Sequence, residues 1–147
     1  MKKQALLKAF LLLLPILAVG LATTVDSVTV FDSVTGETQY YSYFDLLPVE
    51  NQQIVTPLAA ILSLVSGLLA AVYLAAKKPW SLKGTGYTAF AAAIMAVIPI
   101  LIRGDMLVIP NVGLPIFMLA EYVVSYVIAK QPQEEPQSKK APRLKKR

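Results

Sequence analysis

The stretch that decides the fold is residues 54–76, which read IVTPLAAILSLVSGLLAAVYLAA and carry no charged side chain. It begins with Thr56-Pro57, a capping residue followed by a proline that suits the first turn of a helix. At about 1.5 Å per residue, a helix of this length crosses a hydrocarbon core about 30 Å thick. Open strands cannot cross lipid, because their backbone groups would be unpaired there. Residues 54–76 therefore predict a transmembrane helix.

Three further apolar stretches, over residues 5–25, 84–102 and 111–129, predict three more transmembrane helices. The chain has 147 residues, of which 56% are hydrophobic, whereas soluble domains contain about 45–50%. The predicted fold class is therefore an all-α membrane protein, with one four-helix transmembrane domain over residues 1–130. Residues 131–147 combine three prolines with many basic side chains, a composition typical of a disordered tail.

The distribution of basic residues predicts how the chain is oriented. Thirteen of the fourteen lie near the two termini or in the short connection that contains Lys77, Lys78 and Lys83, and residues 23–53 contain none. Because cytoplasmic segments are enriched in Lys and Arg, we expect a multi-pass protein of the cell membrane with both termini in the cytoplasm. We expect the basic tail to attract anionic lipid. The tail has no aromatic side chain on which bases could stack, so no nucleic acid partner is expected.

The N-terminus allows a second interpretation. Lys2-Lys3, an apolar stretch and the small residues Ala18, Gly20 and Ala22 also fit a cleavable signal peptide. Cleavage would leave three helices and would place the new N-terminus outside. The apolar stretch is long for a signal peptide, which favours four helices.

Residues 23–53 form the one sizeable polar segment outside the predicted helices. Residues 25–31 are rich in β-branched side chains, and residues 38–44 read TQYYSYF, which is also β-prone. Turn-forming residues separate them, so we expect a small extracytoplasmic β-hairpin between the first two helices. Four aromatic side chains here fit either an aromatic belt at the membrane interface or a surface that binds a partner. They are Tyr40, Tyr41, Tyr43 and Phe44.

The absence of cysteine and histidine excludes much chemistry. Thiol redox sites need paired cysteines, zinc sites draw mainly on Cys and His, and the common hydrolytic triads need a His base. We therefore expect a protein that is not an enzyme and that holds no metal and no cofactor.

Glu121 is the one acidic residue that lies well inside a predicted transmembrane helix, about ten residues from either end. A charge at this depth is costly, so such a residue is by default a hypothesis about function. Ser63 and Ser66 lie at a similar depth in residues 54–76 and are its candidate hydrogen-bond partners. Two interpretations stay open. A protonated Glu121 ties two helices together, or it binds and releases a proton or a cation in a transport cycle.

Small residues recur at every fourth position of residues 54–76. Such a stripe lets another helix approach closely, either within the chain or in a homo-oligomer. Its members are Ala59, Ser63, Gly67, Ala71 and Ala75.

The run Tyr40-Tyr41-Ser42-Tyr43-Phe44-Asp45, followed by a helix that starts at Thr56-Pro57, resembles uncharacterised small four-helix membrane proteins of Gram-positive bacteria over residues 1–130. This resemblance implies the topology and supplies no activity. The order of helix, hairpin and three helices also resembles the claudin layout. The paired cysteines and Trp motif of a claudin outer loop are absent, so a junction role is not implied.

The expected function is that of a non-enzymatic integral membrane protein with an envelope interaction or structural role. Its partners would be the lipid bilayer and a membrane protein or a second copy of the chain. The alternative is a small oligomeric proton- or cation-coupled transporter or channel component that uses Glu121.

Overall fold

The computed structural model describes residues 2–26, 28–31, 34–45, 54–103 and 109–131. All four predicted helices are present, and each is long and apolar enough to cross a membrane, as a multi-pass membrane protein requires. Two short strands lie between the first and second helices. The elements are α1 (Lys2–Thr24), β1 (Val28–Phe31), β2 (Thr38–Tyr41), α2 (Val55–Ala76), α3 (Pro79–Arg103) and α4 (Ile109–Lys130).

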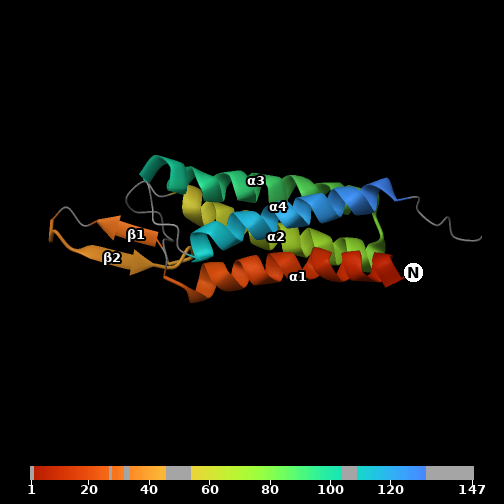
Figure 1. The fold of residues 1–147 in the computed structure, drawn as a ribbon, viewed down its shortest axis with the longest axis horizontal. Coiled ribbons are helices and arrows are strands. Elements are labelled where there is room, and N and C mark those ends of the chain that lie inside the picture. Colours follow the sequence, from red (N-terminus) through yellow and green to blue (C-terminus); the bar gives the residue numbers. More distant parts are fainter. Residues whose placement is uncertain (1, 27, 32–33, 46–53, 104–108, 132–147) are drawn as a thin grey trace, which may run out of the picture.

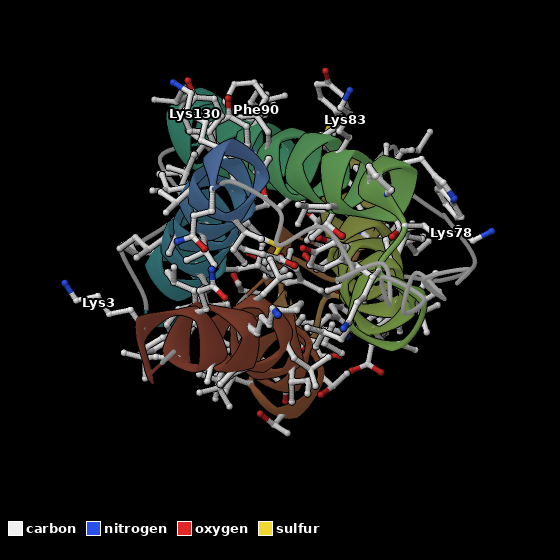
Figure 2. All side chains as sticks on the ribbon, turned by 90° about the vertical axis from the view of Figure 1, so that its right-hand side faces the viewer. Lys3, Lys78, Lys83, Phe90 and Lys130 are labelled. Carbon is white, nitrogen blue, oxygen red and sulfur yellow. The ribbon has the colours of Figure 1, made fainter. Side chains whose placement is uncertain are left out.

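The four helices form an up-and-down bundle (Figure 1). Each helix packs against the ones before and after it in the chain, and α1 also packs against α4, which closes the ring. The N-terminus and the end of α4 lie at one end of the bundle, and the strands lie at the other (Figure 1). Lys3, Lys78, Lys83 and Lys130 point outward around the first end, here called the basic end (Figure 2). The opposite end is called the strand end.

The third helix begins at Pro79, five residues before the predicted start at residue 84. Lys77 ends α2 in a left-handed conformation, with a φ of 51°, and its backbone N–H donates to the Tyr73 carbonyl at 2.8 Å. Pro79 then opens α3, since a proline in the first turn loses no hydrogen bond. The prediction placed Lys83 outside the helix because of its charge. Lys83 instead lies on the exposed side of the first turns of α3.

The buried residues of each helix recur at spacings of three and four, which is the pattern of helices that pack along a shared seam. In α1 and α3 the helix continues through a proline, at Pro15 and Pro99 respectively. The seam of α4 consists of Asn111, Leu114, Met118, Glu121, Ser125 and Ile128.

Small side chains fill the interior, and large apolar side chains cover the outside. Half of the described buried apolar residues are alanines, whereas many leucines, isoleucines and valines of the helices are exposed. A soluble bundle would bury these large side chains, because burial away from water stabilises it. In lipid that driving force is absent, and small residues that allow close backbone contact are favoured between helices. The exposed residues of this kind include Leu6, Leu13, Leu64, Leu68, Ile94, Ile116, Leu119 and Val123.

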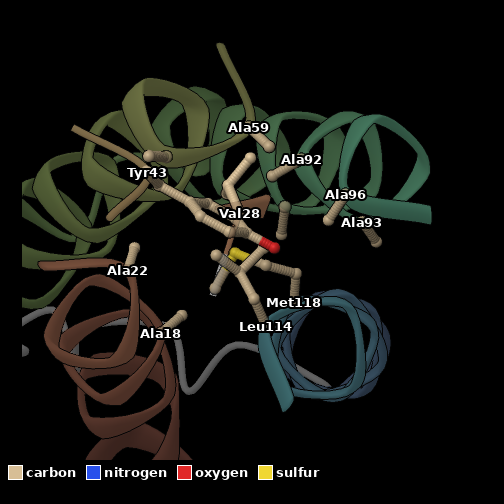
Figure 3. Close-up of a cluster of buried hydrophobic side chains, with 12 residues drawn as sticks. Ala18, Ala22, Val28, Tyr43, Ala59, Ala92, Ala93, Ala96, Leu114 and Met118 are labelled. Atoms are coloured by element: carbon tan, nitrogen blue, oxygen red, sulfur yellow. The ribbon is translucent and has the colours of Figure 1, made fainter. Parts of the chain in front are cut away.

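Two apolar clusters occupy the bundle. The alanine cluster lies toward the strand end, where alanines of α1, α2 and α3 surround Leu114, Met118, Val28 and Tyr43 (Figure 3). The leucine cluster lies toward the basic end. Its members are Leu11, Ala70, Tyr73, Leu82 and Ile128.

Strands β1 and β2 pair antiparallel, with Val28 opposite Tyr41 and Phe31 opposite Thr38. Both strands lie within the two segments predicted to be β-prone. Gly36 has a φ of +72° in the connection between them, a conformation that glycine adopts without a steric cost. The Val28 side chain is buried in the alanine cluster, so the pair lies against the bundle.

The predicted stripe of small residues on α2 lies only partly in the interior. Ala59 and Ser63 are buried, and Gly67 is half-buried, where an added Cβ atom would lie 3.3 Å from Cβ of Pro15. Ala71 and Ala75 are exposed. A four-residue repeat drifts around a helix of 3.6 residues per turn, which explains this change of face. The predicted basic tail, from Pro132 on, lies outside the described residues.

Gly86 provides a test of the packing between α3 and α4. An added Cβ atom would lie 2.7 Å from Oγ of Ser125. We expect Gly86→Val to lower the free energy of unfolding by about 1–3 kcal/mol, because the added side chain overpacks the interface. Unfolding in mixed detergent micelles measures this loss. Gly20→Val is the matched control, since nothing lies within 4 Å of an added Cβ there. Equal effects of the two substitutions would contradict the packing of α3 on α4.

Candidate functional site: a buried polar layer around Glu121

Glu121 lies in the seam of α4, between Met118 on one turn and Ser125 on the next, and its side chain has no exposed surface. Its position near the middle of α4 places it about midway between the two ends of the bundle. The sequence predicted this depth. The structure adds that the carboxyl group points into the bundle and not toward lipid.

Four hydroxyl side chains share this level of the bundle with Glu121. They lie between the alanine cluster and the leucine cluster on α2, α3 and α4, and all are buried. The α1 helix contributes the buried apolar residues Leu14 and Pro15 at this level. We call this set the polar layer. It consists of Ser63, Ser66, Thr85, Glu121 and Ser125.

Three of the four hydroxyl groups donate to a carbonyl of their own helix. The Ser63 hydroxyl donates to the Ala59 carbonyl at 2.9 Å, that of Thr85 to Ser81 at 2.9 Å, and that of Ser125 to Tyr122 at 2.7 Å.

Ser66 differs because its bond joins two helices. Its hydroxyl donates to the Thr85 carbonyl at 3.1 Å and so connects α2 with α3. Each described hydroxyl group of the polar layer therefore donates its proton to a backbone carbonyl.

The Glu121 carboxyl group is left without a hydrogen bond. Neither Oε1 nor Oε2 has a partner among the described residues, although both atoms are buried. The Ser66 hydroxyl is near enough to interact with the carboxyl group, but it does not reach hydrogen-bond geometry. Nearly all buried polar groups in proteins are hydrogen-bonded, so an exception calls for a physical explanation.

The sequence pointed to two of the layer's hydroxyl groups and missed the other two. Ser63 and Ser66 were predicted from their depth as hydrogen-bond partners of Glu121. Both are buried, but their hydroxyl groups donate to backbone carbonyls and neither bonds to Glu121. Ser125 could have been found, because it lies four residues after Glu121 and therefore on the same face of the helix. Thr85 was missed because the predicted helix began at residue 84, which placed Thr85 at a helix end.

The segment after β2 forms a second set of specific contacts, at the strand end. The backbone N–H of Tyr43 donates to the Ala22 carbonyl of α1 at 3.1 Å. The Tyr43 hydroxyl donates to Oδ1 of Asn111, in the first turns of α4, at 3.0 Å. Tyr43 thus joins the strand pair to the ends of two helices, while Tyr40 stays 64% exposed.

The described residues contain no group of three or more acidic side chains, histidines or cysteines that could hold a metal ion. No family model, curated protein or solved structure matches the chain. The polar layer and the Tyr43 contacts are therefore the two candidate functional features of the described residues.

Replacing Glu121 with an apolar side chain of similar size tests whether its carboxyl group makes a stabilising hydrogen bond. We expect Glu121→Met to leave the free energy of unfolding unchanged or higher, because a buried polar group without a hydrogen bond costs about 1–3 kcal/mol. Unfolding in mixed micelles measures the difference. Leu114→Met is the matched control at another buried position of the α4 seam. A loss of more than about 2 kcal/mol in Glu121→Met alone would show that the carboxyl group makes a stabilising hydrogen bond.

Proposed function

We propose that the protein is a non-enzymatic integral protein of the cell membrane that presents its strand pair, as a β-hairpin, to a protein partner outside the cytoplasm. The observation that carries the proposal is the attachment of Tyr43 to α1 and α4. Through it, the strand pair has a fixed position on the bundle.

Fixed attachment matters because an isolated two-stranded hairpin is marginally stable in water. Ordering a flexible segment on binding reduces affinity, so a segment held in place beforehand binds more tightly. Two features hold the strand pair, namely the hydrogen bonds of Tyr43 and the burial of Val28. Ser42 adds local order, since its hydroxyl donates to the Asp45 carboxylate at 2.7 Å.

The exposed side of the strand pair has the character of a binding surface. Thr38, Gln39 and Tyr40 of β2 are exposed, and the Tyr41 hydroxyl donates to the Gln39 side chain. Tyrosine is enriched at protein interfaces, and an exposed strand edge can pair with a strand of a partner. Residues 23–53 contain five acidic residues and no basic one, so a partner with a basic surface would be complementary.

The charges at the other end support the orientation in this proposal. Four lysines, near the start of α1, at the α2–α3 turn, in the first turns of α3 and at the end of α4, gather at the basic end (Figure 2). They are Lys3, Lys78, Lys83 and Lys130. Lys130 also lies over the ring of Tyr126, 4.5 Å from its centre, a pair suited to the membrane interface. A cytoplasmic basic end places the strand pair outside.

Labelling of introduced cysteines tests the orientation. The chain has no cysteine, so Thr38→Cys and Lys83→Cys each provide one exposed thiol. In intact cells, we expect a membrane-impermeant maleimide to label Thr38→Cys and to leave Lys83→Cys unlabelled, because the two positions lie at opposite ends of the bundle. Lys83→Cys should react after the cells are opened. The reverse pattern would place the strand pair in the cytoplasm.

Crosslinking in living cells tests the proposed partner. A photoreactive amino acid at Tyr40 should give a discrete crosslinked protein, whereas the same group at the exposed α2 residue Leu68 should not give that species. Tyr43→Phe removes the bond to Asn111 and should weaken the Tyr40 crosslink without loss of the folded protein. Crosslinks to lipid alone at Tyr40 would contradict the proposal and support an aromatic belt at the interface.

A further inference from the structure

We propose that the polar layer is a proton-binding site, with Glu121 as its acceptor, and that the proton enters and leaves through the basic end of the bundle. This inference goes beyond the proposed interaction role and does not depend on it. It would give the protein a proton-linked activity as well as a binding surface.

The surroundings of Glu121 do not suit an ionised carboxylate. Within the part of the chain that the structure describes, neither oxygen of Glu121 receives a hydrogen bond, and every hydroxyl proton of the polar layer goes to a backbone carbonyl. An ionised carboxylate needs such donors when it is buried. A bound proton removes the charge and turns one carboxyl oxygen into a donor.

Among the described residues, no basic side chain lies close enough to neutralise an ionised Glu121 in place of a bound proton. On α1, Lys8 lies on the inward stripe but nearer the basic end, and it is half-buried. On α3, Lys83 is exposed. The titratable neighbours on α2 and α4 are Tyr73, in the leucine cluster, and Tyr122, whose ring packs on Phe90 at 5.2 Å. Among the described residues, no lysine or arginine pairs with Glu121.

Apolar side chains separate the polar layer from water on both sides, and the two barriers differ in length. Toward the strand end lies the alanine cluster, which spans several turns and includes Leu114, Met118 and the buried Tyr43 ring (Figure 3).

Toward the basic end the barrier is shorter. On α1, the half-buried Lys8 lies one turn from Leu11 in this direction. On α4, one buried apolar residue of the seam, Ile128, lies beyond Ser125, whereas two, Met118 and Leu114, lie between Glu121 and Asn111. Ser125 also extends the polar layer in this direction along α4. The shorter barrier favours exchange with the basic end.

Infrared spectroscopy of the full-length protein in phosphatidylcholine–phosphatidylglycerol vesicles tests proton binding. At low pH, we expect the unsubstituted chain to show a carbonyl stretch of a neutral carboxyl group that is missing from the spectrum of Glu121→Gln. This difference between the two spectra should be lost as the pH rises. Ser66→Ala should keep the band, because the Ser66 hydroxyl donates its proton to the Thr85 carbonyl and not to Glu121. If Glu121→Gln fails to fold, ¹³C labelling of glutamate identifies the band in a chain whose other four glutamates, Glu37, Glu50, Glu134 and Glu135, are replaced by Gln.

Three outcomes would overturn proton binding. A missing band at every pH would mean a permanently ionised Glu121. A band that disappears on addition of sodium at fixed pH, but not with alkali, would mean a cation site. A band that neither titrates nor exchanges its proton for deuterium would mean that Glu121 is permanently protonated and has no access to water.

The direction of exchange is tested by two matched substitutions of fully buried alanines. Ala70→Ser places a hydroxyl in the leucine cluster, and Ala92→Ser places one in the alanine cluster. We expect Ala70→Ser to shorten the time for deuteration of the Glu121 band several-fold in D₂O, and Ala92→Ser to leave it unchanged. Faster exchange in Ala92→Ser alone would overturn the proposed direction and place the opening at the strand end.

Discussion

A carboxyl group is buried between two apolar clusters, and this burial determines how the helices around it have to pack. Glu121 has no exposed surface and no hydrogen bond to any residue that the structure describes, so the surrounding helices must supply the stability that it does not. They do so by close packing above and below the polar layer. The layer itself contains one hydrogen bond between helices, from Ser66 to Thr85. A bundle with a freely hydrated interior would not impose the same cost on this group.

Small side chains make the close packing feasible. Alanines line α2 and α3 over the alanine cluster, and a Cβ atom added to Gly67 or Gly86 would lie 3.3 Å or less from the neighbouring helix. Lipid provides no hydrophobic driving force for the helices to associate, so direct contact between backbones has to replace it. Tyr43 extends this core to the strand pair, because its ring packs in the alanine cluster and its hydroxyl reaches Asn111.

Much of the fold could be predicted from the sequence because lipid permits few alternatives. A long apolar stretch has to form a helix in lipid, and all four helices were predicted on this basis. Depth along a helix also predicted that Ser63 and Ser66 lie at the level of Glu121. The exposure of Ala71 and Ala75 could not be predicted, because it depends on how α2 is rotated about its own axis. The hydrogen bond from Tyr43 to Asn111 could not be predicted either, because it joins segments that are distant in the sequence.

The central claim is that Glu121 faces Ser66 inside the bundle, and solid-state NMR in lipid bilayers tests it most directly. With ¹³C-labelled glutamate and serine, the account predicts a through-space contact between the Glu121 carboxyl carbon and Cβ of Ser66. That contact should be missing in both Glu121→Gln and Ser66→Ala. Contacts from the Glu121 carboxyl carbon to lipid chains, without one to Ser66, would place the side chain outside the bundle and contradict the account.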